Sequence, residues 1–447
     1  MESELTATPP AMSYSNLIKV GVPQGDLQYI TNIPLNGSVF NPQQSIRLAL
    51  SVPLNSFVDL KRAYIKFRVN NPDTSAGMTL DPSAGAGAFI DTMRIYDGSG
   101  GILQETIHYN ALVSLINDLS GSQHVQSSGN VLNGCIETPF KAPVSGAGQA
   151  DIADSTERAV IAKETSKEFI HVPIGEFWNM SRLAPLGFAS GISTVELTLP
   201  NVNTPVTLNS GVSSFTAWTV SNVSLHLPII RCGEEFNNSF RQMISSGIPI
   251  NIHSVGWSNS QQNISSSTTG VVDLTFSSRK RSVKSLVAIC RESGDITNYK
   301  VDSCGARKSL GISSYAYSLG GVQIPSHRVQ INSDDPAATE VYANLEMMQG
   351  RLGHTQSGSC INRSNFKQSN DQTAGSKIAY GLDLQAYNGV QSGKNLSGAG
   401  VPIVLNATLG ASTANAAADA AILVDLYLQY DCIFTLDGVS GVIAKSD

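Results

Sequence analysis

Apolar and polar residues alternate in many short stretches of this chain. Between residues 64 and 69, Ile65, Phe67 and Val69 alternate with Lys66 and Arg68, so a strand would turn its charged side chains away from its apolar ones. Such a strand is half-buried and needs a second sheet to cover its apolar face. Similar stretches predict strands at 46–50, 89–96, 102–107, 169–174, 194–199 and 220–230 in the first half, and at 250–257, 271–276, 283–289, 315–329, 378–384, 401–409 and 422–434 in the second.

Each half also contains one segment with the period of an amphipathic helix. In the first half this segment starts near Tyr109 and ends at Gly121, and its apolar residues fall at i, i+3, i+4 and i+7: Leu112, Leu115, Ile116 and Leu119. In the second half the helix is predicted at 338–348. Both helices lie between the middle strands and the later strands of their half.

The two halves therefore present the same elements in the same order, which indicates a duplicated domain. Roughly eight strands in each half fit a jelly roll better than an immunoglobulin-type sandwich. The predicted fold is all-β: two tandem eight-stranded jelly-roll sandwiches (a double jelly roll), with a short helix in each. We place an N-terminal arm at residues 1–40, the first jelly roll at 41–240 and the second at 241–447.

Length and composition agree with two domains. A chain of 447 residues exceeds one ordinary domain of ~100–200 residues. Hydrophobic residues make up 41% of the chain, enough for two cores, while only 14% of its residues are charged. Abundant Gly, Ser, Asn and Thr suit short strands that are joined by many turns.

The net charge of −6 argues against a protein that coats nucleic acid, because contacts with phosphates need a basic face. One dense basic run, Arg279-Lys280-Arg281 with Lys284, lies between two predicted strands. We interpret this run as a solvated hairpin turn or strand edge. No sequence-specific binding of nucleic acid is expected.

Residue types that carry out catalysis or bind metals are scattered along the chain. The six cysteines have no C-x-x-C spacing, and the seven histidines never occur as H-x-H, H-E-x-x-H or H-x-x-x-H. Cys290 and Cys432 lie in apolar strand sequence and are expected to be small buried hydrophobes. The adjacent Glu234 and Glu235 would point to opposite faces of a strand, so we interpret them as part of a solvated connection between domains. The sequence predicts a protein that is not an enzyme and has no catalytic residue, cofactor or metal.

Several segments resemble double jelly-roll major capsid proteins of DNA viruses, and the similarity is greatest to the polinton-like and adintovirus-like group. Segments 54–67, 89–96 and 100–110 resemble the first jelly roll of that family, while 277–286, 315–325 and the helix at Tyr342 resemble blocks of the second. The resemblance spans about residues 30 to 437 and rests on the order and pattern of these blocks. It implies a homotrimer whose two upright sandwiches per chain form a pseudo-hexameric block that tiles an icosahedral shell.

The resemblance also implies partners and a location. The partners are neighbouring capsomers, and minor capsid proteins or an inner viral layer; the location is the virion, after assembly inside the host cell.

The arm carries a few apolar anchors amid polar and proline-rich sequence: Tyr14, Leu17, Ile18 and Val20. They are too few to form a core, yet more than a solvated tail needs. We predict that these four residues make assembly contacts with a neighbouring subunit or an inner viral layer. Long loops are predicted at 120–166 and 350–376, at the outer end of the sandwiches or at contacts between capsomers.

Two other functions use the same fold. A jelly-roll glycan-binding or attachment protein is the main alternative, but the loop at 120–166 has one aromatic residue, Phe140, and no Trp or Tyr to stack on a sugar. An enzyme of the cupin type needs two or three histidines with a carboxylate at close spacing, and the sequence has no such group.

Overall fold

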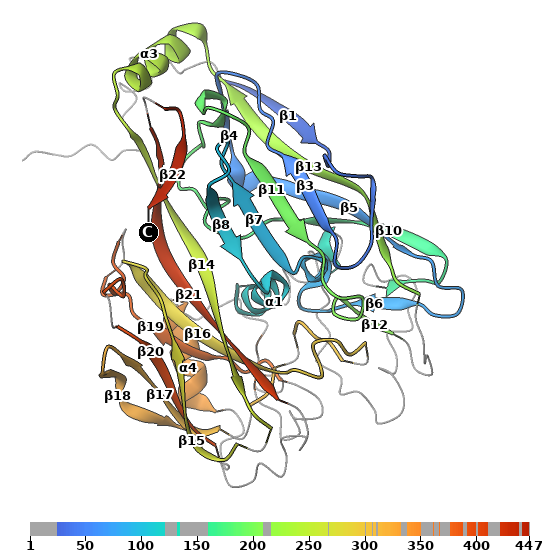
Figure 1. The fold of residues 1–447 in the computed structure, drawn as a ribbon, viewed down its shortest axis with the longest axis vertical. Coiled ribbons are helices and arrows are strands. Elements are labelled where there is room, and N and C mark those ends of the chain that lie inside the picture. Colours follow the sequence, from blue (N-terminus) through green and yellow to red (C-terminus); the bar gives the residue numbers. More distant parts are fainter. Residues whose placement is uncertain are drawn as a thin grey trace, which may run out of the picture.

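The fold consists of two β-rich halves, which the blue-to-green and the yellow-to-red ribbons of Figure 1 distinguish. The computed structural model describes residues 25–120, 132–134, 160–208, 216–266, 268–299, 301–305, 307–309, 312–331, 338–349, 361, 366, 376–387, 391–398, 401–409, 421–437 and 440–446. The halves lie against each other along the long strands β14 (Ile250–Ile264) and β21 (Ile422–Leu436) of the second half.

The first half is a sandwich of two antiparallel sheets with the strand orders β1-β13-β5-β10 and β3-β11-β7-β8. These strands are β1 (Asp26–Asn32), β3 (Ser45–Ala49), β5 (Tyr64–Asn71), β7 (Thr92–Tyr96), β8 (Ile102–Thr106), β10 (Thr165–His171), β11 (Thr194–Thr198) and β13 (Thr219–Arg231). The short strands β2 (Val39–Phe40) and β4 (Ser56–Val58) also pair with β13.

A small third sheet adjoins this sandwich, with the order β12-β6-β9. Its strands are β6 (Met78–Leu80), β9 (Val160–Ile161) and β12 (Val206–Leu208). Three short 3-10 helices complete the described part of the first half: η3 (Leu60–Arg62), η4 (Gly85–Phe89) and η5 (Leu186–Phe188).

The second half is again a sandwich, with the strand orders β14-β21-β16-β19 and β15-β20-β17-β18. The strands not yet named are β15 (Gly270–Phe276), β16 (Val283–Glu292), β17 (Ile312–Leu319), β18 (Val322–Gln330), β19 (Tyr380–Asp383) and β20 (Ile403–Leu409). The C-terminal strand β22 (Ile443–Ser446) pairs with β21.

The two sandwiches have the same topology. When the eight main strands of each half are counted along the chain, one sheet has the order first-eighth-third-sixth and the other the order second-seventh-fourth-fifth, in both halves. The helices α1 (Tyr109–Ser120) and α4 (Thr339–Met348) each follow the fifth strand and precede the sixth. The predicted all-β fold of two tandem jelly rolls, each with a short helix, is therefore confirmed.

A further similarity between the halves lies at the start of these helices. The residue directly before α1 is His108 with φ +50°, and the residue before α4 is Ala338 with φ +46°. Both are in the left-handed region, which residues other than glycine rarely adopt. The shared backbone conformation supports the duplication independently of the strand order.

Burial along the strands follows the alternation in the sequence where one face is solvated. In β5, Ile65, Phe67 and Val69 are buried, while Lys66 and Arg68 between them are partly exposed. In β21, by contrast, burial is nearly continuous, because one face packs inside the second sandwich and the other against the first half. One hydrophobic cluster accordingly runs through both sandwiches.

Four predicted segments need correction, and one of them is the strand at 315–329, which the structure divides into the paired strands β17 and β18. Residues 26–32, which we placed in the arm, form β1 and pair with β13 along their whole length. Part of the predicted loop 120–166 forms β9 and the start of β10. In the predicted strand 89–96, Phe89 ends the 3-10 helix η4 and the strand starts only at Thr92. The loop 350–376 lies mostly outside the described residues.

The basic run at 279–281 does not form a hairpin turn. The strand before it, β15, pairs with β20, whereas the strand after it, β16, pairs with β19 and β21 in the opposite sheet. The run therefore crosses from one sheet to the other. Arg279 and Arg281 are exposed, and the Lys280 ammonium lies 4.1 Å from the centre of the Tyr430 ring, in the geometry of a cation–π contact.

Glu234 and Glu235 do not lie on a strand. They form the first turn of a helix, α3 (Glu234–Ser245), with Gly233 as its N-cap residue. The helix joins β13 to β14, so the interpretation of these residues as a connection between the two halves is confirmed. None of the helices in the described part of the chain is long and apolar enough to cross a membrane.

Candidate functional site

The residues predicted from the sequence as a site are four assembly contacts in the N-terminal arm. Tyr14, Leu17, Ile18 and Val20 lie outside the described residues. Among the residues that are described, no cluster of three or more His, Cys, Asp or Glu side chains could hold a metal ion. Cys290 and Cys432 are buried as predicted, and burial raises the pKa of the Cys290 thiol, which makes it a poor nucleophile. The notable chemistry instead lies between the two sandwiches.

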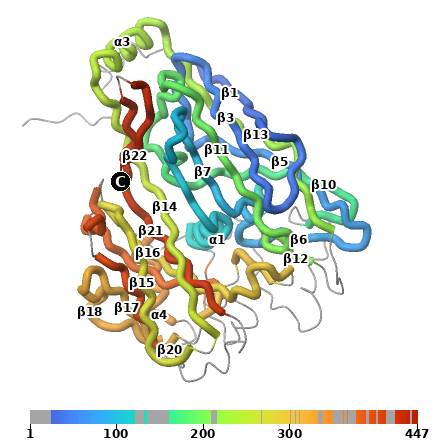
Figure 2. The backbone as a smooth tube through the Cα atoms, viewed as in Figure 1, coloured from blue at the N-terminus to red at the C-terminus, as the bar shows by residue number. Residues whose placement is uncertain are grey.

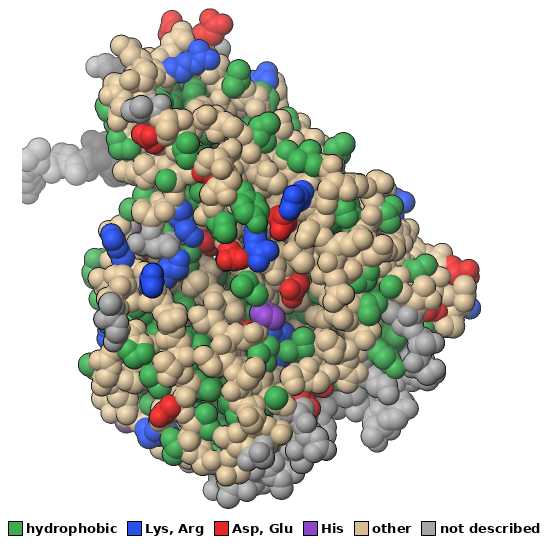
Figure 3. Space-filling view, viewed as in Figure 1, with side chains coloured by type: hydrophobic (Ala, Val, Ile, Leu, Met, Phe, Trp, Pro, Cys, Tyr) green, Lys and Arg blue, Asp and Glu red, His purple; other side chains and the backbone are tan. Residues whose placement is uncertain are grey.

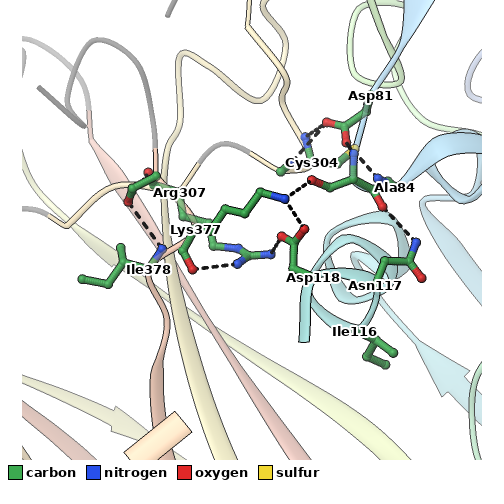
Figure 4. Close-up of polar contacts among 12 residues, drawn as sticks. Asp81, Ala84, Ile116, Asn117, Asp118, Cys304, Arg307, Lys377 and Ile378 are labelled. Atoms are coloured by element: carbon green, nitrogen blue, oxygen red, sulfur yellow. Dashed lines mark hydrogen bonds and ion pairs between the residues drawn. The ribbon is translucent and has the colours of Figure 1, made fainter. Parts of the chain in front are cut away.

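Asp118, near the end of α1, is bound by two cations from the second half (Figure 4). The Arg307 guanidinium donates to Oδ2 at 2.7 Å, and the Lys377 ammonium contacts Oδ1. Lys377 also donates to the Ser83 hydroxyl at 3.2 Å, and Arg307 donates to the Lys377 carbonyl at 3.1 Å. The side chains of Asp118 and Arg307 are fully buried.

The position of Asp118 explains why it needs these partners. A carboxylate in the last turn of a helix faces the negative end of the helix dipole, and burial removes its hydration. Two cations from the other sandwich offset both effects. Since the partners are 189 and 259 residues away in sequence, the contact fixes α1 of the first half to the second half.

A second buried carboxylate, Asp81, joins the halves through backbone groups (Figure 4). Its Oδ1 accepts N–H groups of Ser83 and Ala84 at 3.0 and 2.9 Å, and its Oδ2 accepts those of Cys304 and Gly305 at 3.1 Å each. Burial raises the pKa of this carboxyl, and the four N–H donors oppose the shift. The side chain thus orders a turn in each half.

A third contact centres on Asp425 in β21. Arg291 donates to its Oδ2 at 2.6 Å, and the Gln261 amide donates to its Oδ1 at 3.0 Å. The same amide lies 2.8 Å from Nε2 of His108 in the first half, whose carbonyl accepts the Tyr427 hydroxyl. Burial is the largest single influence and would raise the pKa of Asp425, but the charge of Arg291 and the hydrogen bonds from Arg291 and Gln261 act together with nearby His108 to lower it.

At the other end of the boundary, Glu176 of the first half points into the second. Its Oε1 accepts the Tyr430 hydroxyl at 3.0 Å and the Lys445 ammonium at 3.1 Å. Gly256 passes so close that an added Cβ would lie 2.5 Å from the Glu176 side chain. Next to this contact, the rings of Phe177 and Phe434 meet edge to face with centroids 6.0 Å apart.

The first residue of α1 is also fixed by a buried pair within the first half. The Tyr109 hydroxyl accepts the Ile174 N–H at 2.8 Å and lies 2.7 Å from Nε2 of His171. The hydroxyl can accept this N–H and donate its own proton to Nε2, provided that the imidazole is neutral and carries its hydrogen on Nδ1. Burial lowers the pKa of His171 to about 4, in agreement with this assignment.

Together these contacts make one rigid unit of the two sandwiches. Buried charged pairs contribute little net stability, but they are strongly directional, and breaking one leaves an uncompensated charge. The charged groups of this arrangement bind one another across the boundary between the two halves. The arrangement can hold two jelly rolls at one fixed angle.

The outer surface offers a second candidate site, next to α3. The helix stands at one end of the molecule beside the junction of the two halves (Figure 2), and none of its residues is buried. Its apolar side chains Phe236, Phe240 and Met243 face an apolar groove of about 530 Å³, which also exposes Leu183. Hydrophobic side chains reach the surface at this end of the molecule (Figure 3).

The face shown in Figure 3 is otherwise mostly uncharged, and acidic and basic side chains near its middle lie next to one another. Two ion pairs join neighbouring strands of the first sandwich: Arg47 with Glu196 at 2.9 Å, and Arg94 with Glu105 at 2.7 Å.

Sequence reasoning missed α3, although the signal was present. Phe236, Phe240 and Ile244 recur at i, i+4 and i+8, acidic residues occupy the first turn, and Gly247 follows the last, which is the pattern of a capped amphipathic helix. The buried charges at the boundary have no comparable signal, because Asp118, Arg307 and Lys377 are far apart in the sequence and belong to no recognisable motif.

Comparison with known proteins places this fold. No protein-family model and no curated protein sequence matches the chain. Among solved structures, the capsid of the PBCV-1 virus matches with a TM-score of 0.61 and 11% identity, over 95% of this chain and 98% of that chain. The Sputnik virophage matches with a TM-score of 0.56 and 11% identity, over 99% and 92% of the two chains.

The Faustovirus major capsid protein matches as well, with a TM-score of 0.55 and 10% identity, over 92% of this chain and 90% of that chain. At these identities the likeness concerns the fold, and it covers nearly the whole length of each partner. The chain thus has the double jelly-roll fold seen in viral capsids. None of these three neighbours is described as polinton-like or adintovirus-like, so that group remains a prediction.

Proposed function

We propose that this chain is the major capsid protein of an icosahedral virus. The observation that supports this most strongly is the pair of jelly rolls with identical strand order, joined by buried contacts such as Asp118 with Arg307. The proteins that share this double fold over nearly their whole length are capsid proteins.

The fold suits this function for a geometric reason. Two equivalent sandwiches held at a fixed angle give each chain two similar corners. Three chains around a threefold axis then form a block with six similar corners. Blocks with six corners can pack side by side into a flat facet. A rigid boundary within the chain is essential, because a loose one would make the six corners unequal.

The partners follow from this geometry. We propose that the chain forms a homotrimer that contacts neighbouring capsomers in the virion, and that it meets minor capsid proteins or an inner viral layer. The arm residues Tyr14, Leu17, Ile18 and Val20 are assigned to contacts outside their own sandwich. The neighbours named above are capsid proteins, and they do not support the alternative of a glycan-binding or attachment protein.

Light scattering on the purified full chain tests the proposal. We expect a particle of three times the 47.3 kDa of one chain, and electron micrographs of that particle should show a six-cornered outline. A monomer that persists at high concentration would overturn the proposed function, and so would a trimer of elongated, three-cornered outline.

A further inference from the structure

The groove beside α3 is an apolar surface that no residue in the described part of the chain fills. One wall is α3 itself, and its aromatic residues already pack against the first sandwich: the ring centroids of Phe240 and Phe57 lie 5.0 Å apart, and those of Phe240 and Phe188 lie 4.7 Å apart. Phe236 and Met243 on the same helix remain 41% and 37% exposed. An apolar strip of this kind usually marks a contact with another segment or subunit.

We infer that this groove receives the N-terminal segment of a neighbouring copy of the chain, with Leu17 and Ile18 as its central side chains. The inference rests on the proposed function and specifies where the predicted arm contacts are made. The inference gives α3 a function, since this helix takes no part in the buried contacts described between the two sandwiches.

The path of the chain leads to this groove. Gly25, the first described residue, is one of the groove's lining residues, together with Cys232 at the end of β13. Asp26 pairs with Arg231, so Gly25 lies beside the strand end from which α3 departs. The described fold therefore starts at the groove itself, and 24 residues precede it in the sequence.

The chemistry of those residues matches the groove. The lining is mostly apolar, with Arg182 and Asn251 as its polar side chains. The arm offers four apolar anchors within seven residues, Tyr14 to Val20, and Leu17 and Ile18 are adjacent at their centre. A short apolar segment that fills a groove beside an exposed helix is a common mode of peptide recognition.

The arm is long enough to meet the groove of a neighbouring copy. Val22 precedes Pro23, which favours an extended conformation at Val22. Fully extended chain spans up to about 17 Å from Gly25 to Val20 and up to about 38 Å from Gly25 to Tyr14, which is long enough to reach a neighbouring copy. A contact between an arm and the next copy's groove is heterologous, and a threefold rotation closes it into a ring.

Engineered disulfides test this inference, because Cys232 supplies a thiol in the groove. Leu17→Cys is introduced into the full chain with Cys135 and Cys360 replaced by Ser, and the assembled protein is oxidised mildly and run on non-reducing gels. We expect covalent dimers and trimers, in at least about tenfold greater yield than for Ser13→Cys, since docking raises the local concentration of the two thiols. Adding Cys232→Ser should abolish them.

A second pair of variants tests the groove without altering the arm. Met243→Glu in the Leu17→Cys background places a charge in the groove and should reduce cross-linking by about tenfold or more, as expected when a carboxylate is brought against apolar side chains. Gln242→Glu, on the neighbouring exposed position of α3, adds the same charge outside the groove lining and should leave the yield unchanged.

Each outcome has a definite meaning when light scattering is run on the same samples. A disulfide within one chain, seen as a faster monomer band, would show that the arm reverses at Pro23 and fills its own groove, and would overturn the inference. Trimers without any link between positions 17 and 232 would also overturn it and leave the proposed function standing. Monomers throughout would overturn the proposed function itself.

Discussion

Arg307 of the second sandwich lies 2.7 Å from Asp118 of the first, and neither side chain is exposed to solvent. The two residues are 189 positions apart in sequence. The pair therefore forms only when both jelly rolls are folded and docked, and it reports directly on the boundary between them.

Replacing Arg307 with Met should destabilise the chain strongly. Asp118 would keep Lys377 as a partner but lose its guanidinium, and removing one member of a buried ion pair costs about 3–5 kcal/mol. Urea unfolding followed by circular dichroism should show the lower midpoint. Arg68→Met is the matched control, because Arg68 and its partner Glu168 are 41% and 38% exposed and exposed pairs contribute about 0–1 kcal/mol. Similar midpoints for the two variants would contradict the role given to Arg307.

A methyl group at Gly256 should disturb the boundary from its other end. The added Cβ would lie 2.5 Å from the Glu176 side chain, and overpacking of this kind costs about 1–3 kcal/mol. Gly256→Ala should therefore lower the melting temperature measurably. Gly294→Ala serves as the control, because its Cβ would meet its nearest atom at 4.0 Å. If Gly256→Ala melts no lower than this control, the boundary is more adaptable than its packing indicates.

Because Ala338, the residue before α4, has a left-handed backbone conformation, we expect its replacement by glycine to change the stability of the protein very little. Ala338 has φ +46°, which costs a residue with a side chain about 1–2 kcal/mol. Ala338→Gly removes this strain and offsets the loss of a buried methyl group, so stability should change by less than about 1 kcal/mol. Ala343→Gly, inside the same helix, should cost about 1 kcal/mol. The midpoints of urea unfolding for the two variants test this prediction. If Ala338→Gly loses more stability than Ala343→Gly, the backbone at Ala338 is not strained.

His171 should make the first sandwich sensitive to acid. Its pKa is lowered from 6.5 to about 4 by burial, so the unfolded chain binds a proton between these values and the folded chain does not. Stability from this residue is complete above pH 6.5 and falls as the pH drops toward 4, by about 2 kcal/mol between pH 7.5 and pH 5. His171→Gln keeps an acceptor for the Tyr109 hydroxyl and should flatten this part of the stability–pH curve. Parallel curves for the two proteins would rule out His171 as the source.

Removal of residues 1–24 should separate folding from assembly. The described fold starts at Gly25, and β1 is complete without the arm, so the melting temperature of the isolated subunit should stay nearly unchanged while higher assembly weakens. The melting temperature reports on folding, and light scattering at several concentrations measures the fraction of protein that is assembled. A large drop in melting temperature with assembly intact would mean that the arm packs on its own sandwich.

Much of this fold could be predicted from the sequence because its strands carry local signals. The alternation at Ile65, Phe67 and Val69 reflects a face in water and a face in the core, and the burial of β5 follows it. The repeated order of strands and helices was enough to predict the duplication, which the matching strand orders confirm.

What the sequence did not reveal depends on contacts between distant segments. β1 has polar residues and partly exposed side chains, and it is a strand because β13 offers a free edge. The pairing of Asp118 with Arg307 and Lys377 likewise arises only from docking of the two halves, since nothing near any of the three residues requires a partner. α3 is a different case, because its periodicity was readable and was overlooked.

The buried charges between the jelly rolls have a consequence for any curved assembly of this chain. Each pair permits one arrangement of its atoms, so bending between the two sandwiches would have to expose or separate charges such as Arg307 and Asp118. A closed shell nevertheless needs curvature at its edges and vertices. If the proposed shell forms, its curvature must therefore come from the joints between neighbouring blocks.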